Sequence, residues 1–462
     1  MNTHQIFARH AWLERGWQRD VLISWNHEGL ITAAEPNSTP AEGIESVSWL
    51  LPGMPNLHSH AFQRIFSGMA EFRQNPADSF WSWRKLMYEF AQQITPEQLE
   101  IIATQLYQEM LAAGYTSVCE FHYVHHQPGG KPYQDAIAMS SALVRAAQCT
   151  GIGMTLLPVL YQTSGFGGQP PEVHQRRFTH DMSSFLAFWD QLFGLCQSSN
   201  VKLGLAPHSL RAINPADLQA VLSHIFAADA TAPVHIHVAE QQKEVDDCLA
   251  WSGKRPVQWL LDNFDVDSRW CLIHATHMDA QEYREAADTG AVIGLCPTTE
   301  ANLGDGIFDY RQWQMYKGSW GIGSDSHITV NAAEELLQLE YSQRLRNQQR
   351  NICCNSVEPD VATYLYRKAL QGGAQASGRL ISGIQAGQYA DFVELDAEHP
   401  ALAGISSDYL LAAHVFASSR QTAIRRVWTS GTLCYQGMSM PASLHHDIAA
   451  IRRRVLANRI EE

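Results

Sequence analysis

The sequence predicts an α/β protein: a (β/α)8 TIM-type barrel with a small β-sandwich domain formed from both chain ends. Between residues 50 and 385, short β-branched runs alternate with longer amphipathic stretches, and the final residues of several runs are metal-ligand types. Parallel strands that alternate with helices close into a barrel whose active site lies at the carboxyl ends of the strands. The predicted strands end at His60, Tyr123, Tyr161, Ser209, His237, His274, Cys296 and Asp325.

The two ends of the chain follow another pattern. Residues 20–50 and about 386–435 contain short alternating runs separated by turn residues, which is typical of strands in a small sheet. We therefore expect the chain ends to pair as one β domain. The predicted division is 1–52 and 385–440 for the two parts of the β domain, 53–384 for the barrel, and 441–462 for a terminal helix.

The first long amphipathic stretch after residue 94 shows how a barrel helix is expected to begin and end. Thr95 is a predicted N-cap, Pro96 occupies the first helical position, and Gln98 completes a capping box. Gly114 is placed to end this helix just before the second strand.

Composition narrows the function classes. The chain has 33 Lys and Arg against 47 Asp and Glu, a net charge of -14, which argues against nucleic acid or an anionic membrane as the main partner. No apolar run approaches the roughly 20 residues that a membrane span needs. The nine cysteines are scattered and include no C-x-x-C pair, which favours reduced thiols in a cytoplasmic protein. We expect a cytoplasmic homodimer.

A metal site is predicted from the strand ends. His58 and His60 are one residue apart at the end of a strand, so both imidazoles face the same side. His237 and Asp325 follow two later strands. Three imidazoles and one carboxylate suit one divalent ion, most simply Zn²⁺, with Fe²⁺ or Mn²⁺ as alternatives. Such an ion lowers the pKa of a bound water from about 16 to near 7.

Proton-transfer groups are expected beside this site. Glu240 lies three residues past His237, where a carboxylate can move a proton without binding the metal. His274 ends the sixth strand and could polarise the water or hold the tetrahedral centre. Asp325 is assigned both as a ligand and as a proton acceptor. In isolation Glu240 could be a solvated loop acid and His274 a core histidine, but their positions at the barrel rim favour catalysis.

These motifs resemble the amidohydrolase superfamily, in its one-metal deaminase branch. The resemblance extends over nearly the whole chain. Two-metal members of this architecture usually bridge their ions with a lysine at the end of the fourth strand, whereas Lys202 stands at the start of that strand here, so one metal is expected. The motifs are residues 55–60 (PNLHSH), 235–240 (HIHVAE), His274, 323–326 (GSDS) and 383–392 (GIQAGQYADF).

A narrower resemblance is to the formimidoylglutamate deiminases, enzymes of histidine breakdown. It implies hydrolysis of N-formimidoyl-L-glutamate to N-formyl-L-glutamate and ammonia. The matching segments are residues 60–64 (HAFQR), 81–84 (WSWR), 120–123 (EFHY), 206–211 (APHSLR) and 296–306 (CPTTEANLGDG).

The charged residues of these segments agree with a dicarboxylate substrate. Arg84 and Arg211 can each bind a carboxylate through two parallel hydrogen bonds. Gln63, Tyr123 and His208 are further candidate substrate-binding donors. A nucleobase deaminase, or an amidase that acts on N-acyl amino acids, remains an alternative on the same scaffold. A non-catalytic scaffold protein would be expected to have lost some of the ligands, and this chain keeps all four.

Overall fold

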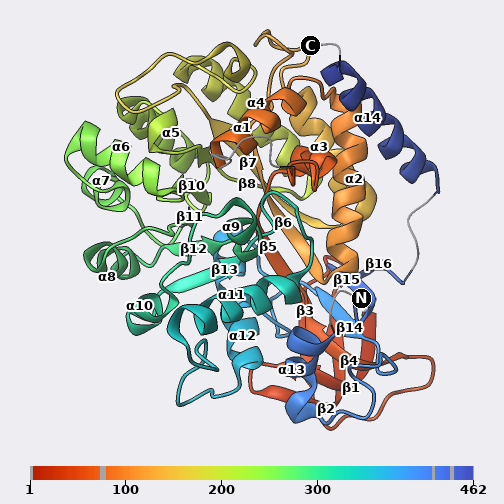
Figure 1. The fold of residues 1–462 in the computed structure, drawn as a ribbon. Helices are drawn as coiled ribbons and strands as arrows, with labels where there is room; N and C mark the ends of the chain where they lie inside the picture. Colours follow the sequence, from red (N-terminus) through yellow and green to blue (C-terminus); the bar gives the residue numbers. More distant parts are fainter. Residues whose placement is uncertain (1–3, 73–79, 419–421, 438–441, 461–462) are drawn as a thin grey trace.

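The computed structural model describes residues 4–72, 80–418, 422–437 and 442–460. Figure 1 shows a barrel of strands surrounded by helices, and below it a sheet to which both chain ends contribute. Helix α14 (Ala442–Ile460) returns from this sheet and lies against α2 (Pro96–Ala112) on the outside of the barrel. The predicted (β/α)8 fold class is confirmed.

The terminal sheet has seven strands in the order β16-β15-β14-β4-β1-β2-β3. The two chain ends meet where β4 and β14 pair antiparallel, with Leu50 opposite Glu394. The terminal sheet has a small apolar core of its own, which includes Ile6, Ile23 and Trp428. The strands are β1 (His4–Leu13), β2 (Gly16–Trp25), β3 (Ile31–Glu35), β4 (Glu45–Pro52), β14 (Phe392–Leu395), β15 (Ile424–Thr429) and β16 (Thr432–Tyr435).

The barrel strands follow the predicted order, and their ends fall within about three residues of the predicted ones. The fourth strand is split at Gly204, where a Cβ atom would lie 2.5 Å from the Pro233 carbonyl oxygen. This close approach of two backbones requires glycine. The strands are β5 (Met54–Ser59), β6 (Tyr115–His122), β7 (Gly153–Leu160), β8 (Lys202–Leu203), β9 (Ala206–Pro207), β10 (Val234–Val238), β11 (Trp270–His274), β12 (Val292–Leu295) and β13 (Ser319–Ile322).

Two continuous runs of parallel strands make up the barrel, and isolated parallel bridges connect them. Ser59 bridges to Asp325 at one junction, and Ser209 bridges to His237 at the other. Each bridge includes a predicted metal ligand, so the closure of the barrel brings the first and last strands of the site together.

Helices cover the outside of the barrel. Helix α2 begins as predicted, because Thr95 accepts a hydrogen bond from the Gln98 amide and Gln98 completes the capping box. The helices are α1 (Phe80–Ala91), α3 (Ala138–Thr150), α4 (Met182–Ser199), α5 (Pro215–Ala228), α6 (Gln242–Ser252), α7 (Pro256–Asn263), α8 (Ala280–Asp288), α9 (Pro297–Leu303), α10 (Tyr310–Met315), α11 (Ala332–Asn347) and α12 (Val361–Ser377), with the 3-10 turns η1 (Ala61–Phe66), η2 (Val173–Gln175) and η3 (Leu210–Ala212).

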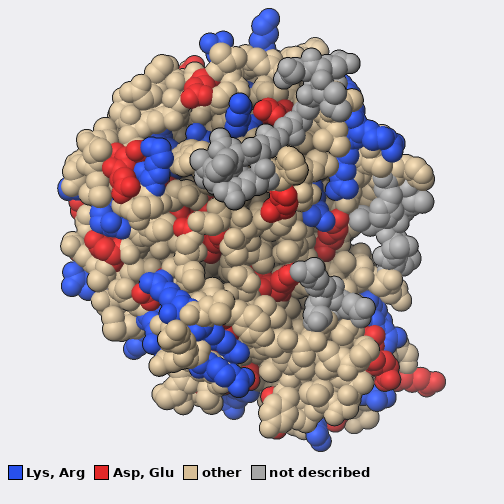
Figure 2. All heavy atoms as spheres, viewed as in Figure 1, with Lys and Arg blue, Asp and Glu red and all other residues tan. Residues whose placement is uncertain are grey.

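One helix was not predicted. Helix α13 (Ser407–Ala417) lies in the segment for which only strands were expected, and it packs on α11 and α12 of the barrel. Among the described helices, none has both the length and the apolar character needed to cross a bilayer. On the face shown in Figure 2, basic and acidic side chains are interspersed, and an elongated basic group lies over the region of α10 and α11.

Candidate metal site and catalytic cleft

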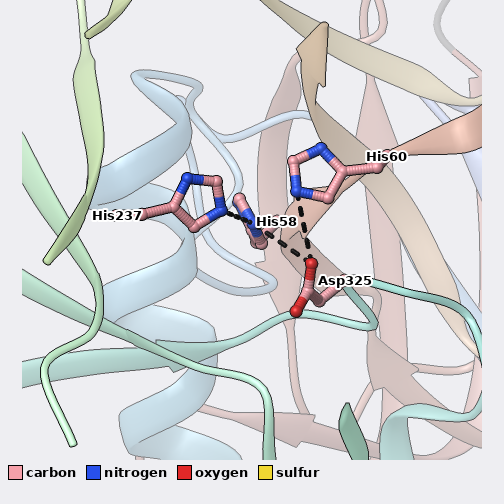
Figure 3. Close-up of side chains that lie close together, drawn as sticks. All are labelled: His58, His60, His237 and Asp325. Atoms are coloured by element: carbon pink, nitrogen blue, oxygen red, sulfur yellow. Dashed lines mark hydrogen bonds and ion pairs between the residues drawn. The ribbon is translucent and has the colours of Figure 1, made fainter. Parts of the chain in front are cut away.

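The predicted metal ligands converge at the carboxyl ends of the strands (Figure 3). His58 and His60 come from the end of β5, His237 from β10, and Asp325 from the turn after β13. One ligand atom of each lies within 4.8 Å of the others, and all four residues are buried. The Asp325 Oδ1 atom lies 3.4 Å from His58 Nε2 and 3.3 Å from His60 Nε2.

Hydrogen bonds around the site set the direction of the imidazole lone pairs. His60 Nδ1 donates to the Phe121 carbonyl at 2.8 Å, and His237 Nδ1 donates to the His208 carbonyl at 3.0 Å. Because Nδ1 carries the proton in both rings, each Nε2 lone pair is free and faces the centre. The Nε2 atoms of His58 and His237 approach to 3.0 Å. Buried nitrogen lone pairs around a carboxylate oxygen are a donor set that fits a divalent cation.

The two predicted proton-transfer residues lie beside this centre. His274 Nε2 is 3.7 Å from Glu240 Oε1 and 3.8 Å from Asp325 Oδ2. Burial raises the pKa of Glu240 to about 7, although His274 acts to lower it. Burial alone lowers the pKa of His274, but Glu240, Glu300 and Asp325 together raise it to about 10. Glu240 can therefore hold or release a proton near neutrality, beside an imidazolium.

Glu300 holds the other side of His274, a contact that the sequence did not reveal. Its Oε1 atom lies 3.3 Å from His274 Nδ1 and accepts a hydrogen bond from the Cys296 amide at 2.9 Å. His274 Nδ1 therefore donates to Glu300, while Nε2 faces Glu240 and Asp325. A base or acid held in one orientation by a further carboxylate is a common catalytic arrangement.

Every predicted substrate-binding residue lines one cleft above the metal centre. Gln63 Nε2 donates to the Tyr123 hydroxyl at 3.0 Å. Arg84 projects from α1 and stacks over Trp81 at 4.4 Å. The cleft is lined by His60, Gln63, Phe80, Trp83, Arg84, Met87, Tyr88, Tyr123, Tyr161, His208, Arg211, His237, Glu240, His274, Leu303 and Asp325.

Arg211 has a partner that was not predicted. Its Nη1 atom lies 3.0 Å from Glu244 Oε2, and both side chains are largely buried. Arg211 is thus held by an acid of its own chain while it lines the cleft. This ion pair is buried rather than on the surface, since the two side chains are only 12% and 1% exposed.

Two tyrosines of the cleft were also missed. Tyr161 was predicted to end a strand but was not assigned to the site. His274 was assigned to the site because it ends a strand, and the same reasoning would have selected Tyr161. Tyr88 lies four residues after Arg84 in α1, so the helical period places both on one face. Gln175 connects the two tyrosines, with its Nε2 atom 2.9 Å from the Tyr161 hydroxyl and 3.3 Å from that of Tyr88.

The residues around the fourth strand bear on the number of metal ions. Lys202 lies at the start of β8, at the opposite end of the barrel, and its Nζ atom is 2.7 Å from Asp229. A second group of possible ligand atoms, from His274, Cys296 and Asp325, shares Asp325 with the first. Burial raises the pKa of Cys296 well above its usual value.

Fold and site together define the class of protein: a barrel hydrolase with a candidate histidine–aspartate metal site at the carboxyl ends of its strands. The sequence model of the Amidohydrolase family matches residues 49–434. The chain therefore belongs to the amidohydrolase family, which confirms the resemblance inferred from its motifs.

Individual relatives narrow the comparison. The chain is 49% identical to the formimidoylglutamate deiminase of Pseudomonas aeruginosa over 427 residues, which cover 92% of this chain and 93% of that protein. An amidohydrolase structure from Brucella melitensis is 43% identical, with a TM-score of 0.92 and coverage of 98% and 100%. An adenosine deaminase from Xanthomonas campestris with bound zinc is 21% identical, with a TM-score of 0.77 and 98% coverage of both chains, and this likeness concerns the fold alone.

Proposed function

We propose that the protein hydrolyses N-formimidoyl-L-glutamate to N-formyl-L-glutamate and ammonia, as a step of histidine degradation. The observation that supports this most directly is the position of two arginines in the cleft that contains Glu240 and His274. The substrate has two carboxylates, and guanidinium groups bind carboxylates while staying charged when desolvated. Similarity to the Pseudomonas aeruginosa enzyme named above supports the same substrate.

The residues of the site have separable tasks. His58, His60, His237 and Asp325 would hold a divalent ion, which, when bound, makes a water molecule nucleophilic at neutral pH. The Asp325 Oδ1 atom faces the two histidines of β5, and its Oδ2 atom faces His274. Oδ2 is therefore the atom that accepts the proton of the attacking water.

Glu240 and His274 complete the proton transfers. As the water oxygen bonds to the formimino carbon, Glu240 donates its proton to the imino nitrogen, which becomes an amino group. His274, which Glu300 holds in place, stabilises the tetrahedral adduct with its positive charge. The adduct hydroxyl then returns a proton to Glu240, the proton on Asp325 passes to the amino group, and the carbon–nitrogen bond breaks to release ammonia.

We further propose that the cofactor is a single zinc ion. The donor set and the position of Lys202 support one ion, and the zinc in the Xanthomonas structure belongs to a protein of the same fold. Metal analysis of the purified chain should give close to one ion per chain. A second ion that accompanies activity in proportion would contradict this.

We also propose that the protein works in the cytoplasm as a homodimer. All nine cysteines are free, which is typical of a reducing compartment. Leu345 of α11 and Tyr409 of α13 are 80% and 68% exposed on two helices that contact each other, and we propose that the dimer covers them. Light scattering of the purified protein tests the dimer, and a monomeric mass at micromolar concentration would contradict it.

A nucleobase deaminase is the second candidate, because the cleft also contains Phe80, Trp83 and Tyr88, which could stack on a flat ring. A neutral ring would offer no carboxylate to Arg84, whereas Arg211 would keep only its pair with Glu244. Ammonia release by the metal-loaded protein should be measured with N-formimidoyl-L-glutamate, N-acyl amino acids and nucleobases. Turnover of a nucleobase, with none of the formimino compound, would exclude the proposed function.

Arg84 provides a test of the dicarboxylate. We expect Arg84→Met to lower kcat/KM by roughly 10- to 150-fold for N-formimidoyl-L-glutamate, since a charge-assisted hydrogen bond is worth about 1.5–3 kcal/mol. An analogue without the matching carboxylate should lose little. Arg145→Met is the matched control, because Arg145 pairs with Glu100 on the outside of the barrel. Equal losses with both substrates would mean that Arg84 only supports the rim.

A further inference from the structure

Glu244 is a buried acid that the proposed chemistry does not use. It lies in the first turn of α6, four residues after Glu240, and its side chain is 1% exposed. Glutamate is almost never fully buried without a partner, because a desolvated carboxylate is costly. Its two oxygens have different partners, and both partners belong to the site.

The first partner is Arg211, in the turn η3 after β9. Glu244 Oε2 lies 3.0 Å from Arg211 Nη1, and Thr163 Oγ1 donates to the Arg211 carbonyl at 3.0 Å. Side chain and backbone of Arg211 are thus both held. Arg211 lines the cleft, and this ion pair keeps one guanidinium nitrogen beside Glu244.

The second partner is the backbone that presents Glu240. Glu244 Oε1 accepts a hydrogen bond from the Ala239 amide at 3.2 Å. Ala239 has a φ of 51°, a left-handed conformation that costs a residue with a Cβ atom about 1–2 kcal/mol. The His277 amide donates to the Ala239 carbonyl at 3.1 Å, so both sides of this strained residue are held. The strain turns the chain just before Glu240.

We propose that Glu244 is a positioning residue that connects substrate binding to proton transfer, since one of its oxygens directs Arg211 and the other holds the backbone turn that presents Glu240. This inference rests on the proposed function. Burial acts to lower the pKa of Arg211, and the charges of Glu244 and Glu240 together raise it above its usual value.

Two substitutions separate the two contacts. In Glu244→Gln the amide oxygen can still accept from the Ala239 amide, while the charge opposite Arg211 is lost. In Glu244→Met both contacts are lost. We expect KM for N-formimidoyl-L-glutamate to rise by about 10-fold in both variants, because a displaced Arg211 would lose one charge-assisted contact with the substrate. We expect kcat to stay within about threefold of wild type in Glu244→Gln and to fall by about 10-fold or more in Glu244→Met.

Binding of glutarate tests whether Arg211 is positioned to hold a carboxylate, in an experiment that involves no catalysis. Glutarate is a dicarboxylate without a scissile bond, and calorimetry on the zinc-loaded full chain should show its Kd rising by about 10-fold in Glu244→Gln. In an Arg211→Met background, Glu244→Gln should add no further change in Kd, because the two residues act through one contact.

Glu282 supplies a matched control. It is also a glutamate with a 1% exposed side chain, and it pairs at 2.7 Å with Arg255, away from the cleft. Glu282→Gln should lower the melting temperature without changing KM or the Kd of glutarate. If Glu244 only stabilised the fold, Glu244→Gln would likewise lower the melting temperature and leave KM and the Kd of glutarate unchanged.

The outcomes are distinguishable. If wild type hydrolyses the formimino substrate and Glu244→Gln behaves like Glu282→Gln, the positioning role is wrong and the proposed function stands. If wild type does not hydrolyse the substrate, the proposed function fails, and the glutarate comparison alone decides the Glu244–Arg211 contact. Wild type that neither hydrolyses the substrate nor binds glutarate overturns both. Equal kcat in Glu244→Gln and Glu244→Met would show that the contact with the Ala239 amide does not position Glu240 for proton transfer.

Discussion

The terminal sheet and the rim of the barrel differ in what they bury. The sheet encloses apolar side chains such as Ile6, Ile23 and Trp428. The rim encloses imidazoles and carboxylates, among them His274 and Glu240, at 1% and 6% exposure. Burial of apolar groups stabilises a fold, whereas burial of ionisable groups costs stability unless each group has a partner.

The backbone of the rim is strained at several site positions, although the terminal sheet also has positive φ values, at Asp20 and Ser430. At the rim, Ala239, His274 and Asp325 all have positive φ values, and each is a site residue or directly precedes one. Strain of this kind persists only where the surrounding structure holds it in place. The rim therefore holds the groups needed for chemistry at a cost in local stability. The apolar cores supply the stability that offsets this cost.

The largest effect is expected from removing a metal ligand. His237→Ala should abolish tight metal retention and activity, since the site loses one of its three imidazole ligands. Metal analysis after dialysis measures this. The control is His235→Ala in the same strand, because His235 Nε2 donates to the Ala376 carbonyl at 2.8 Å and His235 is not one of the converging ligand residues. Equal metal loss in both variants would contradict the assignment of His237.

Glu240→Gln should have the next largest effect. We expect a loss in kcat of about 10² to 10⁴, the usual range for a general acid or base, with the metal retained. Because burial raises the pKa of Glu240, the amide replaces an unfavourably buried acid, and the melting temperature should not fall. Near-normal turnover would falsify the proton-transfer role.

Ile23→Ala tests the other side of the comparison. Ile23 is fully buried in the terminal sheet, opposite Ile6 of β1. Deleting its branched side chain should reduce the free energy of unfolding by about 2–5 kcal/mol. Denaturant unfolding measures this loss, and kcat and KM of the folded fraction should match wild type. A change in KM would show that the sheet and the cleft are not independent.

The smallest effect is expected at the end of the barrel opposite the cleft. Burial would raise the pKa of Asp229, but hydrogen bonds from Lys202 and Thr231 lower it below its usual value. A lowered pKa in the folded state stabilises the protein above the unfolded pKa of about 3.8, and this contribution is lost as pH falls through the folded pKa. Asp229→Asn should therefore cost up to about 1 kcal/mol at pH 7, since the pair is partly exposed. Urea unfolding followed from pH 7 to about pH 3 should show the difference narrowing below about pH 4; a widening difference would contradict this sign.

Most of the elements and the first two candidate metal ligands can be predicted from local patterns in the sequence. Alternating runs predict the barrel because side-chain period and helix caps are local properties of the chain. His58 and His60 could be paired because strand alternation relates residues two apart. The position of a residue at a strand end was enough to select His237, Glu240, His274 and Asp325, since parallel strands in a barrel bring these ends together.

Tertiary structure alone decided which side chains hold one another. Glu300 meets His274 across 26 residues of chain, and Glu244 meets Arg211 across 33. No local rule relates such pairs, because their separation depends on how the helices pack on the barrel. Helix α13 was missed for the same reason: its apolar residues pack on α11 and α12, and this packing outweighs the strand-like pattern around it. Local order can be read from neighbours in the chain, whereas contacts between elements exist only once the whole barrel has closed.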